Sequence, residues 1–168
     1  MSIDYIEQYK ILYMKKPNYG MKSIRFFDII KKIIKNSNIK NILDYGCGKS
    51  LLMDSLEEDL DINAYKYDPA ISEYSNLPTN KVDLIICIDV LQHVPLYDLN
   101  RVLIELKQYG CKCFMHIRCT QYSTMLPNGE FANCTVYPYT WWIKKIGEYF
   151  ESINIISNDK DNVTLMIE

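Results

Sequence analysis

Apolar residues follow two different spacings along this chain, and the two spacings alternate. Short, mostly apolar runs are typical of strands buried in a sheet. Such runs occupy residues 41–45, 62–67, 82–88, 113–117, 153–156 and 163–167. Between them, apolar residues recur every three or four positions, which predicts amphipathic helices at 3–14, 22–34, 50–58, 98–109 and 140–150.

The order of these elements predicts the fold class. Strands that alternate with helices form a mostly parallel, doubly wound α/β sheet with helices on both faces. The last two strands are joined only by residues 158–161, so we expect them to pair antiparallel as a hairpin. A length of 168 residues suits one domain, residues 1–168, in which the helices of residues 1–38 are candidates for a lid.

Two local features refine this picture. Ser50 and Thr140 are of residue types that cap helix N-termini, so we expect helices to begin there. Residues 70–81, which include Pro78, are too few for a further helix and strand before the central strand. We therefore expect a loop in this segment and a shortened sheet.

The composition narrows the classes of partner. A net charge of −2 gives no general attraction to phosphate backbones or anionic membranes, although a local basic patch would still permit nucleic-acid binding. The first residues lack a signal-peptide pattern, and no apolar run reaches the roughly 20 residues that span a bilayer. We expect no association with a membrane and a location in the reducing cytoplasm, which would be that of a host cell if the chain is viral.

Four of the six cysteines, Cys111, Cys113, Cys119 and Cys134, together with His116, suggest a zinc site as one interpretation. The chain contains no paired C-x-x-C motifs, and two of these thiols lie on or beside one apolar strand. We therefore expect buried free cysteines and no bound metal.

The strand at 41–45 ends in a glycine turn, Asp44-x-Gly46-x-Gly48. Glycine allows a sharp turn and the close approach of a ligand that a Cβ would obstruct. The amides that open the next helix are expected to face that ligand. A carboxylate at Asp44 is suited to an ammonium group, directly or through water.

Two further segments follow strands in the same way. Asp68 stands twenty residues after Gly48, where a carboxylate can accept both hydroxyls of a ribose. The central strand ends in Asp89-Val90-Leu91-Gln92-His93. Each feature alone also fits a tight turn, a strand terminator or a packed histidine. Because the carboxyl ends of parallel strands meet at one crevice, the three together predict a ligand site.

On these residues the chain resembles the class I, Rossmann-like methyltransferases that use S-adenosylmethionine. The resemblance rests on residues 42–50 (ILDYGCGKS), on Tyr67-Asp68-Pro69 and on residues 83–94 (DLIICIDVLQHV), which are similar to the family's D-(apolar)-D-V-L-E-H stretch with Gln92 in place of Glu. It covers about residues 40–118. A looser similarity to small phage and bacterial members extends to Leu126-Pro127-Asn128-Gly129 and the Trp141-Trp142 pair.

The resemblance implies a cofactor, S-adenosylmethionine, whose product is S-adenosylhomocysteine. It implies that Gly46 and Gly48 line the methionine part, Asp44 the ammonium end and Asp68 the ribose, while Asp89 and Val90 flank the sulfonium. The full implied cofactor set is Asp44, Tyr45, Gly46, Cys47, Gly48, Ser50, Leu51, Tyr67, Asp68, Pro69, Asp89 and Val90. A nicotinamide site fits less well, since it prefers a third glycine where Leu51 stands and an apolar residue at Asp44.

The shortened segment lacks the strand that usually ends beside the adenine in this family. We therefore expect an adenine pocket made by residues among Ile71, Ser75, Asn76 and Leu77.

Catalysis needs a base if the acceptor is an oxygen or nitrogen with a high pKa. His93 and His116 are the candidates, since histidine titrates near neutrality, although either could merely pack or cap. Arg118 is a candidate for binding an anionic substrate group. Aromatic candidates for the wall of the acceptor site are Tyr19, Tyr122, Trp141 and Trp142, and one of the two tryptophans is expected in the core.

Three functions stay open at this stage. The first is methyl transfer to a small-molecule or nucleotide-like acceptor, and the second is transfer to RNA or protein. The absence of an Asn/Asp-Pro-Pro-Tyr stretch after Ile88 argues against amino methylation of DNA bases. The third is a protein that binds S-adenosylmethionine without catalysis, or cleaves it. The sequence does not fix an oligomeric state.

Overall fold

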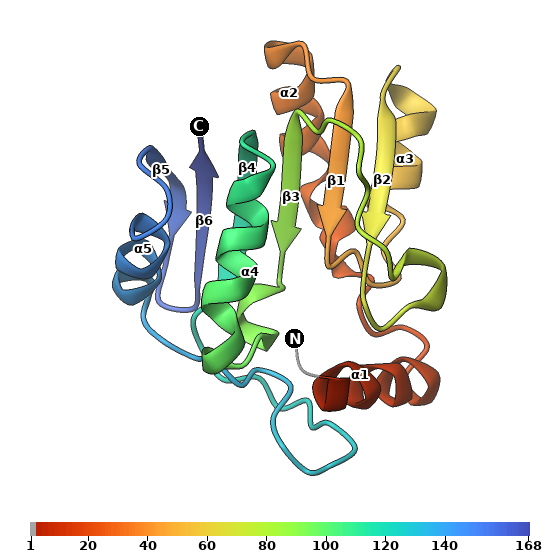
Figure 1. The fold of residues 1–168 in the computed structure, drawn as a ribbon, viewed down its shortest axis with the longest axis vertical. Helices are drawn as coiled ribbons and strands as arrows, with labels where there is room; N and C mark the ends of the chain where they lie inside the picture. Colours follow the sequence, from red (N-terminus) through yellow and green to blue (C-terminus); the bar gives the residue numbers. More distant parts are fainter. Residues whose placement is uncertain (1–2) are drawn as a thin grey trace.

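In the computed structural model, residues 3–168 are described and form one six-stranded sheet. The strands lie in the order β2-β1-β3-β4-β6-β5, and only β6 runs antiparallel to its neighbours (Figure 1). The doubly wound sheet and the antiparallel C-terminal hairpin are thus confirmed. Strand bounds are β1 Asn41–Tyr45, β2 Asn63–Tyr67, β3 Leu84–Ile88, β4 Lys112–Arg118, β5 Ile153–Asn158 and β6 Asn162–Ile167.

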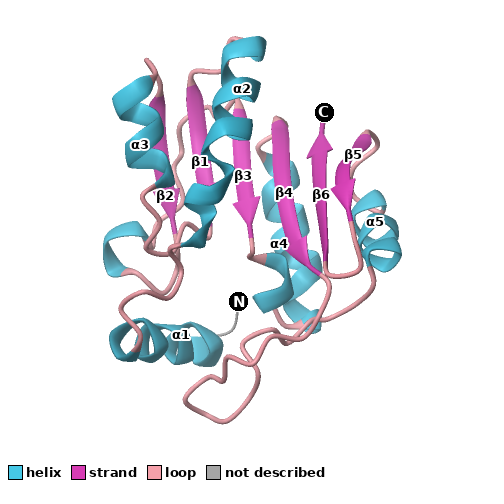
Figure 2. Cartoon of the chain, turned by 180° about the vertical axis from the view of Figure 1, so that it is seen from behind, coloured by secondary structure: helices cyan, strands magenta, loops and turns pink. Residues whose placement is uncertain are grey.

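Helices cover both faces of this sheet. The α-helices are α1 Ile3–Lys15, α2 Phe27–Ser37, α3 Leu52–Asp59, α4 Leu96–Gln108 and α5 Tyr139–Gly147, with 3-10 helices η1 Lys22–Phe26, η2 Ser72–Tyr74 and η3 Leu91–His93. Figure 2 shows α2 and α3 on the near face, with α4 behind the sheet. Successive β1 residues therefore enter different cores, with Ile42 packed among α2 and α3 residues and Leu43 among those of α4 and α5.

The helix starts differ from the predictions. Leu51 and Pro138 stand at the N-cap positions of α3 and α5, and neither helix has a side-chain cap. Thr140 lies inside α5, so the predicted cap there is wrong. Ser50 precedes the cap position of α3, although its hydroxyl accepts a hydrogen bond from the amide of Leu52 at 3.1 Å. The predicted helix at 22–34 is divided into η1 and α2.

The segment after β2 is short, as predicted. Residues 70–81 contain only the single turn η2 and no strand, so β2 forms one edge of the sheet. This loop begins directly at the end of β2, where the carboxylate of Asp68 accepts a hydrogen bond from the amide of Ala70 at 2.9 Å.

Helix α1 lies across the carboxyl ends of the parallel strands, beside the loop of residues 119–138 (Figure 1). Tyr9 and Leu12 of α1 pack with Ala70, Leu126 and Ala132 in a small apolar cluster separate from the two sheet cores. The Tyr9 hydroxyl also donates to the Ala132 carbonyl at 2.8 Å. Helix α1, the turn after it and the start of η1 lie at this end, whereas α2 packs on a sheet face through buried Ile30 and Ile34. Among residues 3–168, no helix has the length and apolar character to cross a membrane.

Candidate functional site

A cavity of about 830 Å³ opens between the carboxyl ends of the strands and α1. It brings together residues from all three sequence segments, namely Tyr45, Gly46, Cys47, Gly48, Tyr67, Asp68, Pro69, Asp89, Val90 and His93. Its size lies within the range of small-molecule and cofactor sites. The strand ends that the sequence placed at one crevice do meet there.

Two positions of the glycine turn, Gly46 and Gly48, have no room for a Cβ. Gly46 has φ +77°, and a Cβ on it would lie 2.4 Å from Cγ2 of Val90. Gly48 has φ +55°, and a Cβ on it would lie 2.7 Å from the Gly20 carbonyl oxygen. The turn is therefore packed on one side by β3's end and on the other by the segment after α1.

The amides of the turn donate to protein acceptors, and so do those of Ser50 and Leu52 at the start of α3, the helix whose first amides were expected to face a ligand. The amides of Gly46 and Cys47 donate to the Tyr67 carbonyl at 2.7 and 3.0 Å. The Lys49 amide donates to the Gly20 carbonyl at 3.0 Å, and the Gly48 amide to Asp68. Since protein acceptors satisfy these donors, a ligand would meet the turn through its Cα atoms and carbonyls.

Replacing Gly46 by alanine should destabilise the fold more than Gly110→Ala, which serves as the matched control. Gly110 also has positive φ, at +59°, but a Cβ there would meet nothing within 4 Å. Gly110→Ala should therefore lose only the backbone preference, about 1 kcal/mol. Gly46→Ala adds the collision with Val90 and should lose about 2–4 kcal/mol in urea unfolding. Equal losses, or no recovery in Gly46→Ala/Val90→Ala, would contradict this geometry.

Asp68 is buried at the end of β2 and holds three donors. Its Oδ2 accepts the Gly48 amide at 3.1 Å and the Tyr13 hydroxyl at 2.8 Å, while Oδ1 accepts the Ala70 amide at 2.9 Å. Burial raises the pKa of Asp68, and these three hydrogen bonds oppose that rise. Two carboxylate oxygens offer about four acceptor positions. One position thus remains, and a hydroxyl that displaced Tyr13 would use a second.

Asp44 is 2% exposed, and its Oδ2 has no hydrogen-bond partner among the described residues. Burial raises the pKa of its carboxyl to about 7, with a smaller contribution from the nearby charge of Asp68, and Lys66 opposes the rise. A buried carboxyl without a partner is costly unless a ligand or water satisfies it. Asp44 does not line the cavity itself, but the next residue, Tyr45, does, so a cationic donor of a ligand would lie close to this carboxyl.

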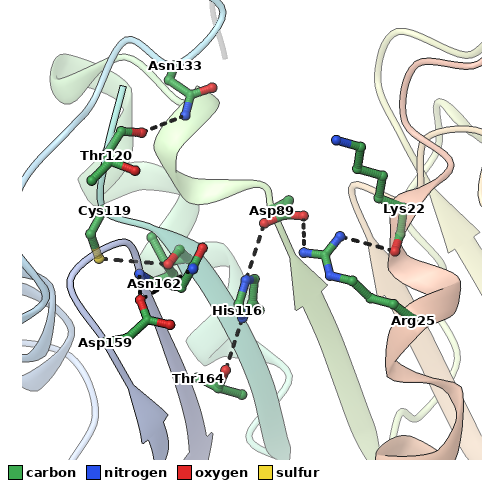
Figure 3. A network of polar contacts seen from close by, with 11 residues as sticks. Lys22, Arg25, Asp89, His116, Cys119, Thr120, Asn133, Asp159, Asn162 and Thr164 are labelled. Carbon is green, nitrogen blue, oxygen red and sulfur yellow. Dashed lines mark hydrogen bonds and ion pairs between the residues drawn. The ribbon is translucent and has the colours of Figure 1, made fainter. Parts of the chain in front are cut away.

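Asp89 is the one carboxylate at the end of β3 and lies at the centre of a polar network (Figure 3). It adopts φ +57°, a left-handed conformation rare outside glycine. Its Oδ2 is 2.6 Å from Nη2 of Arg25, which extends from η1, and its Oδ1 is 3.7 Å from Nε2 of His116. Nδ1 of His116 lies 2.9 Å from the Thr164 hydroxyl. These contacts fix the direction of the carboxylate.

The two histidines differ in what their ring nitrogens meet. His93 lines the cavity, and its Nδ1 lies 2.8 Å from the Ala132 carbonyl oxygen, which can only accept. Nδ1 must therefore carry the hydrogen and Nε2 is left as a proton acceptor. Burial lowers the pKa of His93, so it is neutral at pH 7. His116 is outside the cavity lining and faces Asp89, and burial lowers its pKa as well.

Residues proposed for the acceptor side are only partly brought together. Tyr19, Tyr122 and Arg118 line the cavity. Trp142 is 0% exposed within the core between the sheet and α5, so it is not part of the site. Trp141 instead stacks on Tyr137 with ring centroids 4.0 Å apart, outside the lining.

Other cofactor residues predicted from the resemblance lie beside the cavity rather than in its wall. Ser50 is buried in the turn, and Leu51 is 57% exposed to solvent. Of the four residues expected near an adenine, only Ser75 lines the cavity; Leu77 packs on the core instead. Residues that the sequence analysis missed also line the wall, from α1, the turn after it, η1 and α4: Tyr13, Lys16, Lys22, Arg101 and Val102. No local motif marks them, since the chain brings them there only through tertiary packing.

All six cysteines are free thiols. Within residues 3–168, no three side chains of His, Cys, Asp or Glu gather in an arrangement able to hold a metal ion. Cys113 is a residue of β4 whose side chain is part of the hydrophobic core, and burial raises the pKa of its thiol.

Comparison with solved structures identifies the fold. The methyltransferase domain of bacterial CtHen1 is 14% identical, with a TM-score of 0.61 over 84% of this chain and 96% of that one. The DhpI–SAH complex is 12% identical, with a TM-score of 0.63 over 100% of this chain and 98% of that one. TnmH is 10% identical, with a TM-score of 0.60 over 88% of this chain and 55% of that one.

No protein-family model and no curated protein matches the sequence. The likeness is therefore one of architecture. The chain has the Rossmann-like fold of the class I S-adenosylmethionine-dependent methyltransferases.

Proposed function

We propose that this protein binds S-adenosylmethionine in the cavity and transfers its methyl group to a small-molecule or nucleotide-like acceptor. One observation carries the proposal: the cavity joins the Gly46–Gly48 turn, Asp68 and Asp89–Val90, from the ends of three neighbouring strands. These are the positions at which the resemblance implies the methionine, ribose and sulfonium parts of the cofactor.

The residues present fit that group. Gly46 and Gly48 line the cavity with no side chain projecting into it, and Asp68 has acceptor capacity for ribose hydroxyls. Asp44 Oδ2 is a buried acceptor without a partner, as a site for an ammonium group requires. For the adenine, Tyr45 and Tyr67 line the cavity with ring centroids 4.9 Å apart and supply an apolar wall.

Bound S-adenosylmethionine, held by the Gly46–Gly48 turn, Asp68 and Asp89–Val90, would supply an activated methyl group. The chain's part is to orient the acceptor and exclude water. His93 is the proposed base, because its neutral Nε2 can take the acceptor's proton. His116 is proposed to act through Asp89, by holding that carboxylate in position.

A small acceptor is favoured over a polymer by the site's shape. α1 and the loop of residues 119–138 cover the cavity and are joined by the Tyr9–Ala132 hydrogen bond. The overall charge of −2 adds no attraction for nucleic acid. Methyl transfer to RNA is the second candidate, because one structural neighbour is the small RNA methyltransferase HEN1, 13% identical with a TM-score of 0.61.

Incubating the protein with methyl-labelled S-adenosylmethionine and a cell extract tests the function. We expect label in the small-molecule fraction, identified by mass spectrometry, and a rate at least about tenfold lower for His93→Gln. Label in RNA or protein would select the second candidate. No transfer to any fraction by a protein that binds the cofactor would leave a binding protein and refute the enzyme.

A further inference from the structure

Three cations line the cavity without a carboxylate partner among the described residues. They are Lys16, Lys22 and Arg118, and none makes an ion pair. Arg101, a fourth cation of the wall, is held by Asp98 and Glu105. Arg118 is partly buried, whereas Lys16 and Lys22 are exposed, so this side of the cavity presents positive charge that is available to an anionic ligand.

Two of these cations converge on one aromatic ring. The Nζ of Lys22 lies 5.2 Å from the ring centroid of Tyr122, and the Cζ of Arg118 lies 5.3 Å from the same centroid. Lys22 projects from η1, the short helix that also carries Arg25, as Figure 3 shows. Arg118 is the last residue of β4. The fold thus places a point charge and a planar guanidinium on the same wall.

Two polar atoms on this wall are buried and lack partners. They are Nε of Arg118 and the hydroxyl oxygen of Ser23, a residue of η1 that is 9% exposed. Both residues line the cavity. Since buried donors are almost always satisfied, this unused hydrogen-bonding capacity would suit an acceptor-bearing ligand.

Asp89, the carboxylate at the end of β3, is already paired with a cation. Asp89 is paired with Arg25 at 2.6 Å, and among the described residues no ion pair is found for Lys22 or Arg118. Tyr19 lines the same cavity, and burial, with smaller contributions from Asp89, Tyr122 and Asp68, raises the pKa of its phenol. The excess positive charge is thus in the same cavity as the proposed methyl donor.

We propose that the methyl acceptor carries an anionic group, a carboxylate or a phosphate, which Arg118 and Lys22 bind at the Tyr122 wall. The guanidinium fork fits two oxygens of such a group, the ammonium adds charge, and the Ser23 hydroxyl donates a further hydrogen bond. That the bound anion belongs to a methyl acceptor rests on the proposed function, but binding of an anion at this site can be measured without cofactor.

The probes are inorganic phosphate and acetate, each titrated into the ¹⁵N-labelled protein at constant ionic strength and followed by amide chemical shifts. We expect saturable shifts at residues around Lys22 and Arg118, with the stronger probe showing which oxyanion the site prefers. Arg118→Gln and Lys22→Gln should each raise the dissociation constant at least about tenfold. Arg118→Lys, which keeps the charge and loses the fork, should fall between.

The matched control is Lys32→Gln, which removes one charge from the exposed side of α2, away from the cavity. It should leave the phosphate and acetate constants unchanged. Shifts that do not saturate, or an equal loss in Lys32→Gln, would overturn the anion site. The anion site would also be overturned if Arg118→Gln, Lys22→Gln and Lys32→Gln weakened the binding of a single-stranded RNA oligonucleotide equally. That pattern would mean general attraction of a polymer.

Titration of Arg118→Gln with S-adenosylhomocysteine separates this inference from the proposed function. Unchanged cofactor affinity together with lost phosphate binding is the expected result and also shows that the variant is folded. Normal cofactor binding without any anion site in the wild type would refute the inference alone. An anion site without cofactor binding would refute the proposed function alone.

Discussion

Asp68→Ala should weaken the binding of S-adenosylhomocysteine at least about 100-fold. Asp68 is 6% exposed at the end of β2 and lies in the wall of the cavity. Two ribose hydroxyls donating to a carboxylate each contribute about 1.5–3 kcal/mol, and 1.4 kcal/mol is tenfold in affinity. Isothermal titration calorimetry of both proteins measures the difference.

Asp68 also organises the turn, so the variant needs a stability control. Loss of its bonds to the amides of Gly48 and Ala70 should cost about 1–3 kcal/mol in unfolding free energy. Asp68→Asn keeps the size and one acceptor oxygen and should retain more affinity. Asp61→Ala removes a carboxylate that is 99% exposed and should change nothing. Undiminished affinity in folded Asp68→Ala would show that the ribose does not bind here.

Asp44→Asn should change how the unfolding free energy of the ligand-free protein depends on pH. The pKa of Asp44 is raised to about 7 in the folded state against 3.8 as the ordinary value, because the carboxyl is buried. Between these values the folded protein holds the proton and the unfolded chain does not. Stability from this group therefore falls as pH rises from about 4 to about 7, by at most about 1.4 kcal/mol per unit.

The asparagine variant lacks this slope and should be more stable than wild type at pH 8, by about 1–3 kcal/mol after the cost of its own buried amide. At pH 4 the two proteins should be about equally stable. The same change should weaken cofactor binding, since the ammonium group loses its carboxylate. In the wild type, cofactor binding should strengthen as pH rises towards 7 and release a proton. Parallel stability curves for the two proteins would contradict the assignment.

The sequence predicted where the strand ends meet, because that depends on a local rule. Gly46, Asp68 and Asp89 each follow an apolar run, and parallel strands present their carboxyl ends at one edge. The spacing of these residues along the chain was therefore enough to place them around one cavity. The antiparallel hairpin was predictable for the same kind of reason, since its connection is too short for a crossover.

The contacts of the N-terminal segment were not predictable, because nothing local encodes them. Tyr13 reaches Asp68 and the Gly20 carbonyl receives the Lys49 amide only once α1 packs across the strand ends. The turn's amides, which a local motif would assign to a ligand, donate to Tyr67, Asp68 and Gly20 instead. Trp142 shows the opposite limit: an aromatic residue at helical spacing fits a core position or a site wall equally, and here the core holds it.

Calorimetric titration of the wild-type protein with S-adenosylmethionine and S-adenosylhomocysteine, beside NAD, tests the central claim most directly. The geometry of Gly46, Asp44 and Asp68 predicts saturable one-to-one binding of both adenosyl ligands, with NAD weaker by at least about tenfold. Binding of neither adenosyl ligand, or a preference for NAD, would contradict the account.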